Sequence, residues 1–161
     1  ERFMGNVRVD DKNNTDILVK DILNLKGNEI YSIDAEETLP VAVSKMVEKD
    51  VGSLMVTKKH DGWGQITFYE ILRAIKDSKG NLKYLQVKDV MVEKIVFGHP
   101  EDSMKDVKSL MIDKKIRYLP ILDKDILVGI MSFRDIARAA LNLATHENSM
   151  LKRYIKNWPR A

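Results

Sequence analysis

Apolar residues along the chain switch between helical and strand-like spacing. After Thr38, a residue type that caps helices, the apolar positions fall at helical intervals at Leu39, Ala42, Val43, Met46 and Val47. The short apolar runs 30–33 and 51–57 predict strands, and 58–63 predicts a turn. After Gly64 a second helical stripe follows at Phe68, Ile71, Leu72 and Ile75. The pattern predicts a strand–helix–strand–strand–helix unit.

The same order of elements then starts again. The segment 87–91, Val-Lys-Asp-Val-Met, matches 19–23, Val-Lys-Asp-Ile-Leu. Ile95 matches Ile30, and from there an offset of 65 residues holds without a gap, with 12 identities in 46 pairs from 30/95 to 75/140. A fixed period of this kind indicates an internal repeat. A unit of about 50 residues buries too little surface to fold alone, so we expect the two copies to pack face to face.

The repeat divides the chain into five segments. Polar residues 1–16 are expected to form a mobile lead-in, 17–78 the first repeat, 79–86 a linker, 87–145 the second repeat, and 146–161 a C-terminal amphipathic helix capped by Asn148 or Ser149. The apolar stripe of that last helix comprises Leu151, Tyr154, Ile155 and Trp158. Such a helix either folds back on its own module or binds a partner or a membrane surface.

Composition narrows the possible functions. The 27 basic and 24 acidic residues nearly balance, and nucleic-acid binding would need a broader basic stripe or a reading motif. No apolar run approaches the length of a membrane span. The absence of cysteine excludes disulfides, thiol catalysis and thiolate metal sites. His60, His99 and His146 are too dispersed to suggest a metal site, and no paired nucleophile and base stands out. We therefore expect no catalysis and no catalytic cofactor.

The strongest chemical signal lies at residues 129–135, Gly-Ile-Met-Ser-Phe-Arg-Asp, where an apolar strand stops at a hydroxyl. Ser132 occupies a helix N-cap position, where unpaired backbone N–H groups and the helix dipole favour a phosphate. Asp135 adds oxygens suited to a sugar diol. Thr67 and Glu70 repeat the arrangement. Ser-x-x-Asp is also an ordinary capping box, and Ser103 to Asp106 repeats it with no strand before it, so capping alone is the alternative interpretation.

These motifs resemble the cystathionine-β-synthase (CBS) domain, and the tandem resembles a CBS pair, or Bateman module, over about residues 17–143. The likeness rests on 87–91, on 116–123 (Ile-Arg-Tyr-Leu-Pro-Ile-Leu-Asp) and on 129–135. The first repeat departs from the family at Glu70, Gln65 and Met55. The resemblance implies an α/β (α+β) fold, with two β-α-β-β-α repeats packed about a pseudo-twofold axis.

The resemblance also implies a function. Such pairs are regulatory modules that bind adenosine-containing ligands (AMP, ADP, ATP, S-adenosylmethionine or NAD) between the repeats, commonly as homodimers, and signal to a regulated partner protein. The alternatives are a ligand-free scaffold for protein–protein contact and, more remotely, a small hydrolase or nucleic-acid binder that uses the basic tail. The layout is similar to plant organelle-targeted CBS-pair proteins, which suggests a mitochondrial or other organellar location, with a cytoplasmic one as the alternative.

Two unequal ligand sites follow from carrying the family pattern onto this chain. The stronger site is expected to comprise Ile95, Arg117, Tyr118, Pro120, Ser132, Arg134 and Asp135. The weaker site is expected to comprise Ile30, Gly52, Ser53, Met55, Thr67 and Glu70. The second is ranked lower because Glu70 is one methylene longer than aspartate and Tyr69 replaces an arginine.

Overall fold

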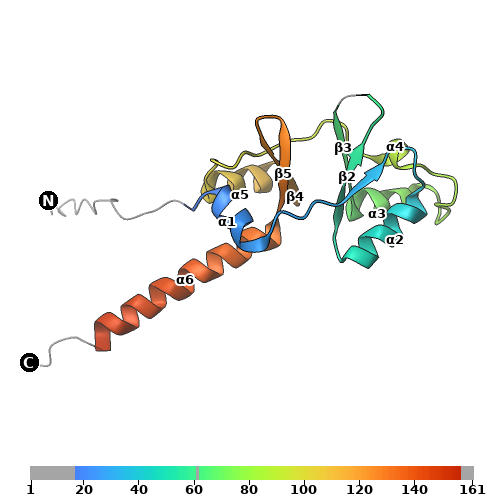
Figure 1. Ribbon diagram of the computed structural model, residues 1–161. Coiled ribbons are helices and arrows are strands. Elements are labelled where there is room, and N and C mark those ends of the chain that lie inside the picture. The colour runs from blue at the N-terminus through green and yellow to red at the C-terminus, as the bar shows by residue number, and fades with distance from the viewer. Residues whose placement is uncertain (1–16, 61, 157–161) are drawn as a thin grey trace, which may run out of the picture.

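The computed structural model describes residues 17–60 and 62–156, which form two small sheets side by side with helices packed on each (Figure 1). The first half contains β1 (Ser32–Asp34), α2 (Leu39–Lys49), β2 (Ser53–Thr57), β3 (Trp63–Thr67) and α3 (Phe68–Asp77). β1 pairs in parallel with β2, and β3 pairs antiparallel with β2. α2 makes the crossover that a parallel pair requires, and α3 starts directly where β3 ends.

The second half repeats this plan with one strand missing. It contains α4 (Val87–Val90), α5 (Met104–Asp113), β4 (Tyr118–Asp123), β5 (Ile126–Ser132) and α6 (Phe133–Lys156). The strand expected after Ile95 is reduced to one parallel bridge between Gly98 and Ile121. A Cβ at Gly98 would lie 2.9 Å from side-chain carbons of Leu119 and Ile121, so the core fills the space of a side chain there. Glycine also weakens a strand.

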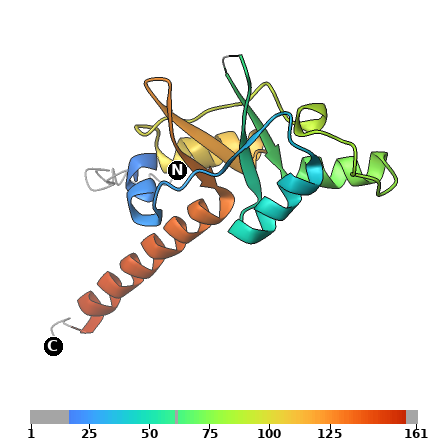
Figure 2. The same ribbon diagram turned by 45° about the vertical axis from the view of Figure 1, so that its right-hand side comes forward.

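The helix that begins each sequence repeat packs in the core of the other half of the fold. Val19, Ile22 and Leu23 of α1 (Val19–Lys26) are buried in the core of the second half, with β4, β5 and α5. Val87 of α4 is buried in the core of the first half. The exchange is visible in Figure 2, where α1 lies beside the second sheet although it precedes the first. The packing units therefore differ from the sequence repeats.

Matching bonds hold both exchanged helices. Lys20 pairs with Glu101 at 2.9 Å, and Lys88 pairs with Glu36 at 2.7 Å. Lys88 follows Lys20 by 68 residues and Glu101 follows Glu36 by 65, so the two ion pairs are equivalent under the pseudo-twofold axis. In each pair, the hydrogen bond that the lysine donates to the carboxylate raises the lysine pKa. Both lysines are solvent-exposed, so these pairs orient the helices and add little stability.

The C-terminal prediction needs a correction. Residues 133–156 form one continuous helix, so Asn148 and Ser149 do not cap a separate one. The segment contains no glycine or proline that would end a helix. In both views α6 extends away from the two sheets and does not fold back on them (Figures 1 and 2). The structure describes only the backbone at Leu151, Tyr154 and Ile155 of the predicted apolar stripe, whereas Trp158 and the lead-in 1–16 lie outside the described residues.

Candidate functional site

The turn from β5 into α6 has the geometry of a capping box. The backbone N–H and the hydroxyl of Ser132 both donate to Asp135 Oδ2, at 2.8 and 2.9 Å. The Asp135 N–H in turn donates to Ser132 Oγ at 3.2 Å. The Phe133 N–H donates to the carbonyl of Arg117, the residue just before the neighbouring strand β4, at 3.2 Å. These bonds hold the carboxylate at the positive end of the α6 dipole, which stabilises negative charge.

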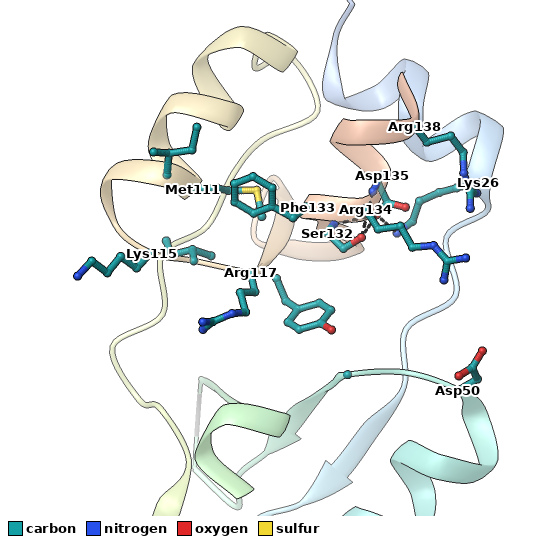
Figure 3. A pocket seen from close by; sticks show the side chains of 14 residues that line it. Lys26, Asp50, Met111, Lys115, Arg117, Ser132, Phe133, Arg134, Asp135 and Arg138 are labelled. Atoms are coloured by element: carbon teal, nitrogen blue, oxygen red, sulfur yellow. Dashed lines mark hydrogen bonds and ion pairs between the residues drawn. The ribbon is translucent and has the colours of Figure 1, made fainter. Parts of the chain in front are cut away.

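This turn forms one wall of a cleft of about 850 Å³ between the two halves, here called the Ser132 cleft (Figure 3). It is lined by Lys26, Asp50, Gly52, Met111, Ile112, Lys115, Ile116, Arg117, Tyr118, Ser132, Phe133, Arg134, Asp135 and Arg138. Five of these side chains are cationic and two are carboxylates. The excess of positive charge favours an anionic ligand, because a cleft lined by one sign of charge concentrates ions of the opposite sign.

Tyr118 stands where the two halves meet. A Cβ on Gly52 would lie 1.9 Å from Tyr118 Oη, so the absence of a side chain at Gly52 lets the phenol approach the first half. The ring packs edge-on against Phe68 at 6.2 Å between centroids. Burial raises the pKa of the Tyr118 phenol, and the smaller effect of Arg117 lowers it. The phenol therefore stays protonated at neutral pH and presents a hydrogen-bond donor.

A second cleft, here called the Thr67 cleft, has a volume of about 490 Å³ and opens at the equivalent turn. The hydroxyl and N–H of Thr67 donate to Glu70 Oε2 at 2.5 and 2.8 Å. Its lining comprises Gln65, Thr67, Tyr69, Glu70, Val92, Lys94, Ile95, Val96, Lys114, Lys115, Ile116, Arg117 and Tyr118. Residues 115–118 line both clefts, and the Arg117 guanidinium lies 5.5 Å from the ring centroid of Tyr69.

Comparison with known proteins decides the family. The model of the CBS domain matches residues 19–77 and again 87–142. The chain belongs to the CBS domain family. It is a CBS pair, with the two-repeat α/β fold and the pseudo-twofold expected from the motifs.

Three relatives place this CBS pair more closely. It is 32% identical over 120 residues to the CBS domain-containing protein YhcV of Bacillus subtilis, a match that covers 74% of this chain and 82% of that one. It is 28% identical over 147 residues to the mitochondrial CBS domain-containing protein CBSX3 of Arabidopsis thaliana, covering 86% of this chain and 71% of that one. The crystal structure of CBSX2 in complex with AMP is 26% identical, with a TM-score of 0.60, and covers 71% of this chain and 90% of that one.

The structure gathers most of the predicted stronger site into the Ser132 cleft of the CBS pair. Arg117, Tyr118, Ser132, Arg134 and Asp135 all line it.

Two residues assigned to that stronger site lie elsewhere. Ile95 lines the Thr67 cleft, because the chain after α4 pairs with β3 through Gln65 and Val92, and β3 leads to Thr67. Pro120 is buried in the β4–β5 ladder opposite Ile130, and it is not among the described residues that line either cleft.

The predicted weaker site is divided in a similar way. Thr67 and Glu70 line the Thr67 cleft, whereas Gly52 faces Tyr118 in the Ser132 cleft. Three further residues, which belong to or precede strands of the first sheet, line neither cleft within the described part of the chain: Ile30, Ser53 and Met55. Ser53 and Met55 are buried in β2.

The sequence interpretation missed four charged residues of the Ser132 cleft: Lys26, Asp50, Lys115 and Arg138. Arg138 carried a signal, since it lies one turn after Asp135 and is identical to Arg73 in the repeat. Lys26 carried none, because it lies 109 residues before the Asp135 that it contacts. Only the exchange of α1 between the halves brings it there.

The described residues support neither a metal site nor a membrane-spanning helix. No three of their histidine and carboxylate side chains converge as metal ligands would. None of the helices within 17–60 and 62–156 combines the length and apolar character needed to cross a membrane.

Proposed function

We propose that this CBS pair is a non-catalytic regulatory module that binds an adenosine nucleotide, with the Ser132 cleft as its principal site. One observation carries the proposal: the Ser132–Asp135 turn opens into a basic cleft of about 850 Å³ between the halves. Small-molecule sites span roughly 300–1,000 Å³. AMP bound to the relative CBSX2 supports the same class of ligand.

In the proposed complex each part of the nucleotide meets a matching group. The phosphate lies at the N-terminus of α6, within reach of Arg117 and Arg134. The ribose hydroxyls donate to the carboxylate of Asp135. The base packs beside Tyr118, whose ring offers an aromatic face and whose phenol can donate to a ring nitrogen. The Thr67 cleft is the weaker site, because it is smaller and Glu70 replaces the aspartate.

A ligand panel tests this proposal. AMP, ADP, ATP, NAD and S-adenosylmethionine are added separately to the intact chain, and thermal unfolding and titration calorimetry are recorded. A ligand that binds only the folded state at 100 times its Kd stabilises that state by about 2.7 kcal/mol. We expect AMP, ADP or ATP to raise the melting temperature, and the cationic S-adenosylmethionine to have the smallest effect. No response to any of the five would contradict the proposal.

A ligand-free scaffold is the second candidate, and one observation favours it. The Asp135 carboxylate already carries the ammonium of Lys26 at 2.6 Å. A side chain that fills the ribose position in this way would suit a cleft that no longer binds anything. The ligand panel separates the two functions, since a scaffold responds to none of the nucleotides.

We propose that the module forms a homodimer through α3 and α6. Leu72 and Ile75 on α3 are 57% and 40% exposed, and Phe133 on α6 is 40% exposed. Apolar side chains left exposed on these two helices favour a partner surface, and Phe133 also lines the Ser132 cleft. Leu72→Glu is therefore expected to convert a dimer to a monomer at micromolar concentration in light scattering. Lys105→Gln, an exposed change on α5 that also alters the net charge by one, should leave the mass unchanged. A wild-type monomer would contradict this prediction.

A further inference from the structure

The last residue of α1, the helix that packs on the second half, reaches into the Ser132 cleft. Lys26 Nζ lies 2.6 Å from Asp135 Oδ2 (Figure 3). It also lies 2.5 Å from the carbonyl oxygen of Ile130. The side chains of Lys26 and Asp135 are 26% and 12% exposed, so the ion pair is largely shielded from water. A shielded pair is screened less by salt and is harder to separate than one on the surface.

Asp135 Oδ2 accepts three hydrogen bonds. Besides Lys26, the N–H and hydroxyl of Ser132 donate to Asp135 Oδ2. In the Thr67 cleft, by contrast, the donors to Glu70 Oε2 recorded among the described residues come from Thr67 alone. Lys94, which stands 68 positions after Lys26, lines that cleft without a recorded bond to Glu70. A lysine on the carboxylate therefore distinguishes the Ser132 cleft from its repeat.

We propose that Lys26 makes the Ser132 cleft selective for phosphorylated nucleosides over nucleosides. This inference rests on the proposed function. In the empty cleft the ammonium neutralises Asp135. When a nucleotide binds, the ribose hydroxyls take the carboxylate, and Lys26 transfers its hydrogen bonds to the phosphate. The lysine side chain suits this exchange, because it is a point charge with three donors on a flexible stem.

Selectivity follows from what each ligand offers the displaced lysine. A nucleoside must compete with Lys26 for Asp135 and gives the ammonium no anion in return. A nucleotide supplies its own anion within the same cleft, where Lys115, Arg117, Arg134 and Arg138 already provide a positive field. The separation of the ion pair therefore opposes nucleoside binding and is offset only when a phosphate is present.

The test measures AMP and adenosine affinities by calorimetry for the intact wild type, Lys26→Gln and Lys26→Arg. For the wild type we expect AMP to bind at least ~10-fold more tightly than adenosine. Lys26→Gln should reduce that ratio by about 10-fold, with weaker AMP binding and equal or tighter adenosine binding, as the loss of one charge-assisted bond implies. Lys26→Arg should largely keep the ratio. Lys20→Gln, on the same helix but paired with Glu101 outside the cleft, is the matched control.

The outcomes separate this inference from the function on which it rests. If the wild type binds neither AMP nor adenosine, the proposed function fails and the role of Lys26 fails with it. If the wild type prefers AMP and Lys26→Gln keeps the same ratio, the selectivity role alone is overturned. Equal affinities of the wild type for AMP and adenosine would also overturn it. Should Lys26→Gln unfold, Lys26→Met replaces it, since the stem and its packing are then retained.

Discussion

Replacement of Asp135 by alanine is expected to weaken AMP binding by one to two decades. The carboxylate is the group that can accept from the ribose hydroxyls, and one charge-assisted hydrogen bond contributes about 1.5–3 kcal/mol, or roughly 10- to 100-fold in affinity. The loss of AMP affinity should exceed the loss caused by weaker capping of α6 alone. Weaker capping lowers the stability of the helix but removes no contact with the ligand. Calorimetry with AMP measures the change.

The chain offers a close control for this substitution. Ser103 and Asp106 form the same Ser-x-x-Asp motif at the start of α5, and the Asp106 N–H donates to Ser103 Oγ at 3.0 Å, as that of Asp135 does to Ser132. Asp106 lies outside both clefts. Asp106→Ala should therefore leave AMP affinity unchanged. If Asp135→Ala binds AMP as tightly as the wild type and Glu70→Ala does not, the two clefts have been ranked in the wrong order.

Leu23→Ala is expected to give the largest loss of stability, about 2–5 kcal/mol in the free energy of unfolding, as for other buried leucines cut to alanine. Leu23 is 3% exposed in α1 and lies in the core of the second half. A Cβ on Gly129 of β5 would come within 2.7 Å of it, which shows how closely the helix packs on that sheet. The loss should appear in urea unfolding as a lower midpoint with an unchanged slope.

Leu25 provides the control on the same helix. Its side chain is 86% exposed, so Leu25→Ala should change stability by no more than about 0.5 kcal/mol. Equal effects at the two positions would mean that α1 does not contribute to the core of the second half. The exchange of helices between the halves would then be wrong.

Local patterns predicted most of the fold. The offset of 65 residues follows from elements whose hydrophobic spacing survives in both copies, such as the helices after Thr38 and Ser103. The loss of the strand near Gly98 was not predicted, because Ile95 matches Ile30 at the start of the equivalent apolar run in the first repeat. The uninterrupted α6 was not predicted because Asn148 and Ser149 are good caps, yet no residue between Phe133 and Lys156 breaks the helix.

Some residues of the candidate site could be predicted from a local motif, and others reach it only through tertiary packing. Ser132, Arg134 and Asp135 lie within four residues of one another, so one turn of backbone brings them together, and a local motif reveals them. Lys26 reaches the cleft only through the packing of α1 on the other half. A tertiary contact also explains why position 65 departs from the family pattern. The Gln65 Nε2 donates to the Tyr118 carbonyl across the two halves at 3.2 Å. Sequence spacing carries no information about such partners.

We propose that an adenosine nucleotide occupies the cleft at the start of α6. A titration of the isotope-labelled chain with AMP, followed through backbone amide resonances, tests this occupancy. We expect saturable shifts that are largest at residues 132–135 and at Arg117 and Tyr118, all of which line the Ser132 cleft. Shifts confined to the turn at Thr67 and Glu70, or no shifts at millimolar AMP, would contradict the claim.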